Sequence, residues 1–531
     1  MTLVYKGDIL KTTIETRVWR FFVELLIFLE EGERLIMKTL SSKYYGENGI
    51  HRVPLWRIGC FALNNTATNL YMFAMNFVAY YLAGWVGVGT VVAGSFSMMM
   101  RMWDGVTDPF VGFMVDKTNG KFGKNRPFMV IGNVILFVTS YILFHVTHLL
   151  PMAARFPFFI VVSAVYYLGY TAQCVVTKSA QSALTNDPKQ RPLFTIFDGV
   201  YNTILFAGLQ VVATNLAVSY GGFTADPALF HDLWMIAALA SAVCTTLAVI
   251  AIAPKDRSEF FGTGEATKVT FKDYWDTLKG NRAIQMLIVS ASSDKLASSM
   301  KGNAVINIVL IGTVVGNYAI NGTLSGMISI PTMILMILGV GGLATRLGQR
   351  KAMLIGSWGG IVTLVALIAL FLFGDPTTMA TAEGTLNWGF FTIAYLVLNI
   401  VLGGFSGISG NIVIPMTADC ADYEVYRTGK YVPGLMGTLF SFVDKMVSSF
   451  APMLLSMCYA AIGFKDALPD VGVPYSDQLF YVTLFLAYGI VIIGLLCNVV
   501  ALKFYPLTKE KMEEIQGEIA AIKAKAMAGN N

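Results

Sequence analysis

The sequence has little charge. Of its 531 residues, 13% are Asp, Glu, Lys or Arg, whereas a soluble domain carries about 25%. The six cysteines occur singly, without a CxxC or metal-binding spacing, and the four histidines form no HExxH motif. These absences argue against a soluble multidomain enzyme and against a disulfide framework.

Long apolar runs are present instead. Hydrophobic residues make up 55% of the chain, and the mean hydropathy is +0.62. A spanning helix needs roughly 20 apolar residues to cross a hydrocarbon core of about 30 Å, and barrel strands of about ten alternating residues do not fit these continuous runs. The sequence therefore predicts an all-α membrane protein with twelve spans, at roughly 54–83, 86–115, 127–149, 156–184, 192–219, 228–253, 283–316, 320–344, 352–373, 387–416, 433–462 and 478–505.

Basic residues fall mostly on one side of these spans. Positively charged loops stay in the cytoplasm, and placing the even-numbered loops there leaves only Arg155 and Lys465 in the opposite loops. We therefore expect a multi-pass protein embedded in the lipid bilayer of the plasma membrane, with both termini cytoplasmic.

A hydrophilic stretch divides the spans six and six. This predicted cytoplasmic loop, 254–282, separates an N-terminal bundle at 54–253 from a C-terminal bundle at 283–505. Each half has a basic turn after its second span, at 116–127 and 345–351. Matching turns at matching places indicate internal duplication, as in transporters whose halves move about a central site.

Two segments lie outside the predicted bundles. Residues 1–53 are expected to be a cytoplasmic extension, in which 1–36 are either a surface amphipathic helix or the result of a mis-called start before Met37. Residues 506–531 alternate charges at helical spacing and predict a cytoplasmic tail helix.

Charged side chains occur in the span at 86–115. Arg101, Asp104 and Asp108 lie at i, i+3 and i+7 on one helix face, with Asp104 near the membrane midplane. Ionisable groups at that depth are costly unless they are paired or hydrated. Two carboxylates one turn apart favour a bound cation or a shared proton; a static salt bridge with Arg101 is the alternative.

Polar residues on other spans extend this predicted site. Thr171 supplies a hydroxyl that completes a cation shell, and Lys445 needs a carboxylate partner, for which the two aspartates are the natural candidates. The alternatives are helix packing for Asn64, snorkelling of Lys178 to the cytoplasmic interface, pairing of Asp198 with Lys178 or a gate residue, and neutralisation of Asp294 by the adjacent lysine. The residues expected to contact the solute are Asn64, Tyr167, Cys174, Lys178, Asp294 and Lys301.

Charged residues also surround the predicted cytoplasmic turns. In a transporter built from two halves, such residues connect helices at the gate. The predicted gate and latch residues are Asp116, Lys117, Arg126, Arg346, Arg350, Asp419 and Asp422.

Two segments resemble the signatures of a known family. RMWDGVTDPFVGFMVDKTNGKFGKNRP, from Arg101, and MTADCADYEVYRTGKYVPGLMGTLFSFVDK, from Met416, are similar to those of the glycoside–pentoside–hexuronide:cation symporters, which include the melibiose carrier. The resemblance covers roughly 54–505 in order and spacing. It implies the major facilitator fold, with two pseudo-symmetric six-helix halves.

The resemblance also implies roles for individual residues. It implies that Asp104, Asp108, Thr107 and Thr171 bind the cation and that Arg101 and Lys445 take part in coupling. The positions of the melibiose carrier's two sugar-binding carboxylates hold Asn64 and Cys174, and its sugar-stacking aromatic is replaced by Lys178. These departures argue against a melibiose-like galactoside.

We therefore expect a secondary active transporter, not an enzyme, that co-transports a sugar-type solute with Na⁺, Li⁺ or H⁺ by alternating access. A hexuronide or an amphipathic lipid-like solute is the alternative cargo. We expect no cofactor beyond the co-transported cation, no nucleic acid and no required protein partner. A membrane-embedded enzyme would need a nucleophile–base or metal constellation, and a sensor would need a signalling domain; neither is evident in the sequence.

Overall fold

A computed structural model describes residues 52–118, 120–185, 190–257, 278–339, 347–381, 384–428 and 442–528. These residues are nearly all helical, and within them β pairing is limited to two isolated bridges. The all-α prediction is confirmed. The predictions for 1–51 and for most of the loop at 254–282 fall outside the described residues.

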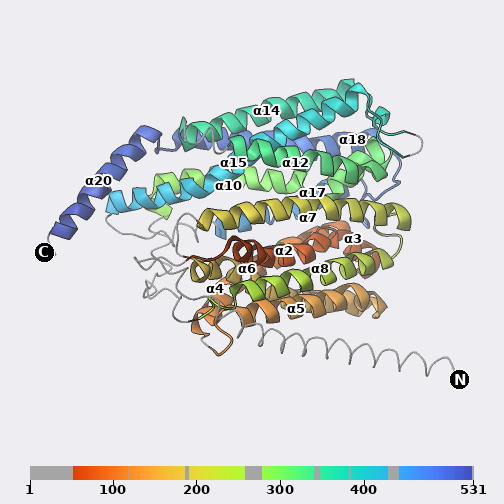
Figure 1. Ribbon diagram of the computed structural model, residues 1–531. Coiled ribbons are helices and arrows are strands. Elements are labelled where there is room, and N and C mark those ends of the chain that lie inside the picture. The colour runs from red at the N-terminus through yellow and green to blue at the C-terminus, as the bar shows by residue number, and fades with distance from the viewer. Residues whose placement is uncertain are drawn as a thin grey trace.

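The helices follow the predicted spans in order (Figure 1). The first half contains α2 (Leu55–Met75), α3 (Val78–Tyr81), η1 (Leu82–Val86), α4 (Thr90–Lys117), α5 (Arg126–His145), η2 (Thr147–Leu149), α6 (Met152–Leu184), α7 (Arg191–Tyr220) and α8 (Ala228–Ile252). The second half contains α10 (Arg282–Lys301), α11 (Ala304–Asn307), η4 (Ile308–Val314), η5 (Tyr318–Ile320), α12 (Asn321–Gly339), α14 (Gln349–Phe373), η7 (Pro376–Met379), α15 (Phe390–Thr428), a helical stretch at 442–448, α17 (Ala451–Ala461), α18 (Asp477–Leu484), η8 (Phe485–Gly489) and α19 (Ile490–Phe504). The tail forms α20 (Lys509–Ala528).

Proline marks several helix starts. Pro54, Pro151 and Pro227 immediately precede α2, α6 and α8, where a residue without an N–H costs no helical hydrogen bond. In contrast, α15 continues to Thr428, well beyond the predicted end at residue 416. Hydropathy marks where a helix leaves the lipid, and a helix can continue into water beyond that point.

Among the described residues, eight helical segments are long and apolar enough to cross a membrane. They are Arg126–Leu149, Met152–Gln181, Leu193–Tyr220, Ala228–Ile252, Tyr318–Met336, Gln349–Phe373, Phe390–Thr428 and Asp477–Phe504. The other four predicted spans correspond to α2, α4, α10 with its continuation, and the helical residues 442–461. Asn64, Asp104, Asp294 and Lys445 lie on these four segments. Polar side chains lower their hydropathy because these helices contribute the polar interior of the bundle.

The two halves repeat one packing pattern. In the first half, α2 packs on α8, α5 on α6 and α8, and α4 on α6; in the second, α10 packs on α19, α14 on α15 and α19, and α12 on α15. The equivalent helix of each half thus has the equivalent neighbours, and the two halves lie side by side in Figure 1. This is the predicted pair of pseudo-symmetric halves.

Among the described helices, α4 with α17 and α7 with α12 pack extensively across the halves. A glycine permits each close approach. A Cβ on Gly94 of α4 would lie 2.7 Å from the Pro452 carbonyl oxygen, and a Cβ on Gly322 of α12 would lie 2.8 Å from the Val211 Cα. Both glycines lie in the first turns of equivalent helices, so the same device operates in both halves.

Hydrogen bonds between loops close one end of this interface. The Asp470 carboxylate accepts from the Phe223 N–H at 3.1 Å, from the Thr224 N–H at 2.8 Å and from the Thr224 hydroxyl at 2.7 Å. Gly222 has a φ of +129°, and a Cβ there would lie 3.0 Å from the Asp470 carboxylate, so this turn favours glycine. Tyr80 also donates to the Pro469 carbonyl at 2.8 Å. We call this the Asp470 end, and the opposite end, which carries α20, the tail end.

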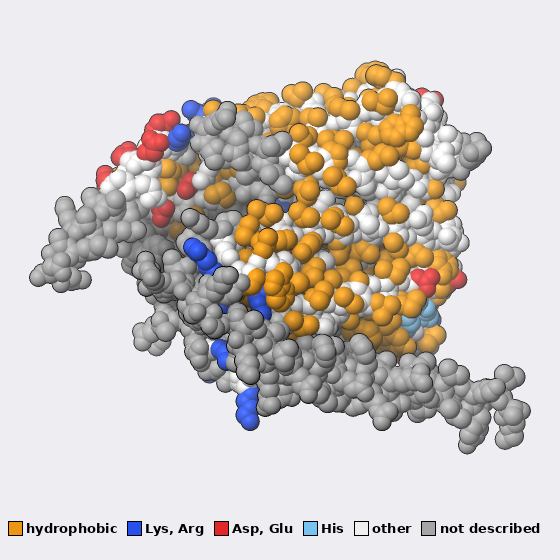
Figure 2. All heavy atoms as spheres, viewed as in Figure 1, with side chains coloured by type: hydrophobic (Ala, Val, Ile, Leu, Met, Phe, Trp, Pro, Cys, Tyr) orange, Lys and Arg blue, Asp and Glu red, His pale blue; other side chains and the backbone are white. Residues whose placement is uncertain are grey.

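Figure 2 shows hydrophobic side chains over the flank of the bundle, with Lys and Arg side chains gathered toward the tail end. Large exposed apolar residues such as Val362, Val243 and Phe113 lie along helices of both halves. Apolar exposure of this extent marks a lipid-facing surface. The chain is a multi-pass membrane protein.

A buried polar network ties four helices of the second half together. The Asn498 side-chain amide donates to Ser357 Oγ at 3.0 Å and to Ser409 Oγ at 3.3 Å, and its carbonyl accepts from the Ser290 hydroxyl. All four side chains are fully buried. Because no water reaches these groups, they depend on one another for hydrogen bonds.

Asn498→Ala should therefore destabilise the second half. It leaves three hydroxyls without their shared partner, a loss of about 1–2 kcal/mol. Thermal unfolding in detergent should show a lower midpoint than wild type. Asn399→Ala is the matched control, because the Asn399 amide donates only to the Tyr395 carbonyl of its own helix, at 2.9 Å. Equal midpoints for the two variants would contradict this role.

Candidate functional site

The central feature of the site is a lysine shared by two carboxylates. Lys445 Nζ donates to Asp104 Oδ2 at 3.1 Å and to Asp108 Oδ2 at 2.5 Å. The aspartates project from one face of α4 because they are four residues apart, and Lys445 belongs to the other half. The pairing anticipated from the sequence is present, and it joins the halves inside the bundle.

Two threonines complete an oxygen-rich environment around Asp104. Thr171 of α6 donates to Asp104 Oδ1 at 2.8 Å, and the Thr107 hydroxyl lies 3.1 Å from that of Thr171. The Asp104 side chain is 7% exposed, whereas the Asp108 side chain is 36% exposed. Carboxylate and hydroxyl oxygens are ligands suited to a hard cation. One of the two carboxylates is thus buried and oriented, and the other is accessible to solvent.

The Lys445 ammonium neutralises the two carboxylates. It bridges them, and they would repel each other without a positive charge between them. A cation bound to the same oxygens would supply that charge in place of the ammonium.

Arg101 does not pair with these carboxylates. Its side chain is exposed and forms no hydrogen bond or ion pair with a residue that the structure describes; it lies within electrostatic range of Asp444. The alternative of a static salt bridge between Arg101 and the α4 aspartates is wrong for this conformation, in which Lys445 takes that place.

The residues anticipated for the solute are distributed over both halves. Asn64 is buried, and its amide nitrogen donates to Thr177 Oγ1 at 2.7 Å and to the Gln173 carbonyl at 3.3 Å, which is the helix-packing alternative. The Tyr167 ring is buried against its neighbour Tyr166. Cys174 is half-buried, and Lys178 is exposed.

On α10, Asp294 and Lys301 are two turns apart and do not pair. Asp294 is 8% exposed and has no hydrogen bond or ion pair among the described residues. The Lys301 ammonium lies 6.0 Å from the centroid of the Tyr488 ring. These two residues therefore have different surroundings and do not form one contact surface.

A polar row between α2 and α7 was only partly anticipated. Asp198 pairs with Asn65, whose amide donates to both carboxylate oxygens at 2.7 and 2.9 Å, and not with Lys178, which was one of the two alternative partners. One turn further, Asn69 donates to the Asn202 carbonyl oxygen at 2.8 Å. The sequence signal for this row is the i, i+4 spacing of polar residues on both helices.

The anticipated latch residues connect helices mainly within each half. Arg126 Nε lies 3.7 Å from Asp256 Oδ2, and Asp256 also accepts from backbone N–H groups at the start of α5. Arg350 donates to the Leu502 carbonyl at 3.0 Å, and Lys117 lies over the ring of Phe113. Asp256 was not singled out because it lies in the hydrophilic loop.

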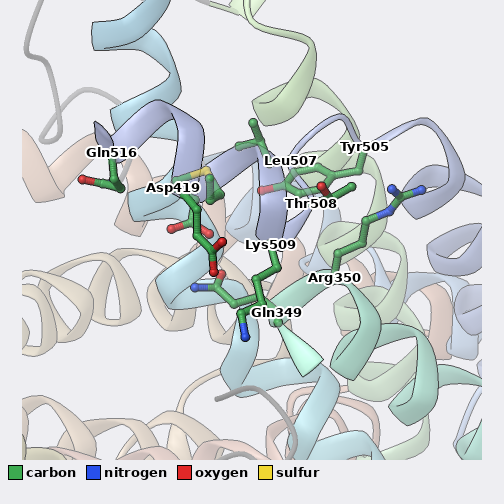
Figure 3. A pocket seen from close by; sticks show the side chains of 11 residues that line it. Gln349, Arg350, Asp419, Tyr505, Leu507, Thr508, Lys509 and Gln516 are labelled. Carbon is green, nitrogen blue, oxygen red and sulfur yellow. The ribbon is translucent and has the colours of Figure 1, made fainter. Parts of the chain in front are cut away.

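The remaining latch residues lie near α20. Asp422 accepts from Gln516 of α20 at 2.6 Å. Figure 3 shows Asp419, Gln349 and Arg350 at a cavity of about 490 Å³ where α14, α15 and the tail helix meet. This cavity belongs to one half and is separate from the Lys445 contact. Arg346 and the side chain of Asp116 lie outside what the structure describes.

Comparisons with known proteins agree with this geometry. A family model described as MFS/sugar transport protein matches residues 60–509. The chain is 23% identical over 487 residues to a glucuronide carrier protein homolog of Escherichia coli (strain K12), covering 87% of this chain and 95% of the relative. It is 22% identical over 477 residues to the isoprimeverose transporter of Lactiplantibacillus pentosus, covering 87% of this chain and 91% of that relative.

Solved structures show the same fold. The crystal structure of nucleoside transporter NupG matches with a TM-score of 0.55 at 14% identity, over 85% of this chain and 100% of that one. The relatives and structural neighbours are membrane transporters, so the chain is a transporter and not an enzyme. It belongs to the MFS/sugar transport protein family, and its two signatures are those of the glycoside–pentoside–hexuronide:cation symporters within it.

Proposed function

We propose that the protein co-transports a sugar-type solute with one monovalent cation, Na⁺, Li⁺ or H⁺, and that Asp104 and Asp108 bind the cation. The observation that carries the proposal is the Lys445 ammonium bridging the two carboxylates from the other half. Thr107 and Thr171 would contribute further oxygens to the cation.

Coupling follows from the competition for the carboxylates. When a cation occupies them, Lys445 is released, and the interface between α4 and the 442–461 segment loses its central ion pair. The released ammonium then becomes available to the solute. Each ligand must bind more tightly when the other is present, and this reciprocity is what defines coupling.

Access alternates between the two ends of the bundle. By the positive-inside rule, the tail end with its basic residues would be cytoplasmic and the Asp470 end would face outward. The bonds to Asp470 then close the outer side in this conformation. For solute to enter from outside, these bonds must break while the helices of each half move as a unit.

A hexuronide is the preferred solute class within this proposal. Arg101, Lys178 and Lys295 are exposed and form no ion pair with a described residue, so they leave positive charge for an anionic sugar. The Asn65–Asp198 and Asn69–Asn202 pairs supply donors and acceptors for hydroxyl groups. The relative described as a glucuronide carrier homolog agrees with an anionic sugar. A lipid-like solute would need a lateral opening between the halves. At the Asp470 end, the close helix contacts at Gly94 of α4 and Gly322 of α12 occupy that position.

The direct test is uptake by right-side-out vesicles. A panel of labelled glycosides and uronides should reveal a solute that accumulates when Na⁺, Li⁺ or a proton gradient is imposed. Asp108→Asn should reduce that accumulation to simple equilibration, because one of two cation-binding carboxylates is lost. Asp477→Asn, at the Asp470 end, is the control. Full accumulation by the Asp108 variant would refute the assignment.

Lys445→Ala separates coupling from folding. If Lys445 takes part in coupling, the variant protein that reaches the membrane should lose cation-driven accumulation while still binding cation, because nothing competes for the carboxylates. Lys445→Arg should retain part of the coupling. If Lys445 is only a structural counter-charge, the yield of Lys445→Ala should fall and coupling should remain intact in the protein that is inserted.

Asp470→Asn should favour opening at the Asp470 end. It removes the acceptor charge from the three hydrogen bonds that cross between the halves. A hydrogen bond to a charged group contributes about 1.5–3 kcal/mol. A net loss of about 1.4 kcal/mol across the three changes the opening equilibrium tenfold. A cysteine replacing Leu324, buried on α12, should react about tenfold faster with an impermeant thiol reagent added outside. Asp466→Asn is the matched control, because Asp466 is exposed in the same loop. Unchanged labelling would count against the latch.

A further inference from the structure

A groove on the outer surface of the second half plays no part in the site described above. It lies between α10 and α19 and has a volume of about 360 Å³. Its lining is entirely apolar: Met286, Val289, Ile493, Leu496, Cys497, Val500, Ala501 and Phe504. Val289 is 48% exposed and Val500 is 58% exposed, so the groove is open toward the surrounding lipid.

The groove has the length of one leaflet. On α19 it runs from Ile493 to Phe504, which at 1.5 Å per residue is about 16 Å. Half of a hydrocarbon core of about 30 Å is about 15 Å. Phe504 is the last residue of α19, and Met286 lies one turn into α10. The groove therefore lies in the leaflet at the tail end and ends near the headgroup level.

Positive charge lies at the headgroup end of the groove. The Arg282 guanidinium carbon is 5.9 Å from the centroid of the Phe504 ring. Arg282 is exposed and makes no hydrogen bond or ion pair with the part of the chain that the structure describes. Lys503, next to Phe504, is also exposed, and none of the described residues that line the groove is acidic.

We propose that this groove binds an anionic phospholipid of the leaflet at the tail end, with an acyl chain along the apolar lining and the phosphate at Arg282. A guanidinium matches phosphate with parallel N–H···O bonds, and basic residues at the end of a membrane groove recognise anionic headgroups. A bound lipid would stabilise the position of α10, and α10 also carries the buried Asp294 of the bundle interior. The proposal needs only the membrane-embedded fold and does not rest on the transport function.

The lining favours a lipid chain over another protein helix. Helices that associate in membranes use small residues so that their backbones can approach closely. Here Met286, Leu496 and Phe504 are large, and Cys497 and Ala501 are the small residues of the lining. A flexible acyl chain can follow such a surface without close backbone contact.

Retained lipid can be measured by native mass spectrometry of the full chain released from nanodiscs of equal phosphatidylglycerol and phosphatidylcholine. Wild type should retain phosphatidylglycerol preferentially, and Arg282→Gln should lower that preference about fivefold, which corresponds to about 1 kcal/mol per basic residue near the surface. Lys511→Gln is the matched control, because it removes one positive charge at the same end of the same half, from α20. Val500→Trp should fill the groove and reduce retention of both lipids while Arg282 is intact.

Four outcomes would overturn the proposal. Equal retention of the two lipids by wild type, or the same lipid preference for Arg282→Gln and Lys511→Gln, would contradict the headgroup contact. If Val500→Trp left lipid retention unchanged, the anionic lipid would be held by the positive charge of the surface alone and not by the groove. An excess of inorganic phosphate should leave the bound phospholipid in place, since phosphate lacks the acyl chain; displacement would also contradict the groove.

Discussion

The ammonium of Lys445 between two carboxylates of α4 is the interaction on which the rest of the structure depends. An unpaired charge inside a membrane protein costs several kcal/mol, so both the aspartates and the lysine require a partner of opposite sign. The partner comes from the other half of the molecule. In the proposed mechanism, this contact between the halves depends on what occupies the carboxylates, and a small cation would compete with the ammonium for their oxygens.

The two ends of the bundle use different kinds of contact. At the Asp470 end, hydrogen bonds to loop backbone groups and glycine-mediated helix contacts connect one half to the other. At the tail end, Arg126, Arg350 and Asp422 bind within their own halves. Buried networks such as that around Asn498 stiffen each half internally. Rigid halves joined by breakable contacts suit movement of the halves as units around the central ion pair.

Sequence reasoning succeeded where a single physical rule dominated. Apolar length located the helices, and i, i+4 spacing placed Asp104 and Asp108 on one face with Lys445 as their partner. It was less successful for residues whose partners lie on another helix. For Asp198, Lys178 and a gate residue were the alternative partners, but the structure pairs it with Asn65. Asn64 donates to α6. Spacing along one helix indicates which face a residue occupies, but not which helix that face meets.

The sequence alone determined the membrane class, the order of the helices, the duplication of the chain and the acidic pair, since these follow from hydropathy, periodicity and short-range spacing. Only the tertiary structure decided which partner Asp198 takes, which end of the bundle is closed and where an apolar groove remains on the surface. Those features depend on contacts between residues far apart in the chain, such as Asp470 with Phe223. Packing of the two halves brings such residues together, and no local pattern specifies that geometry.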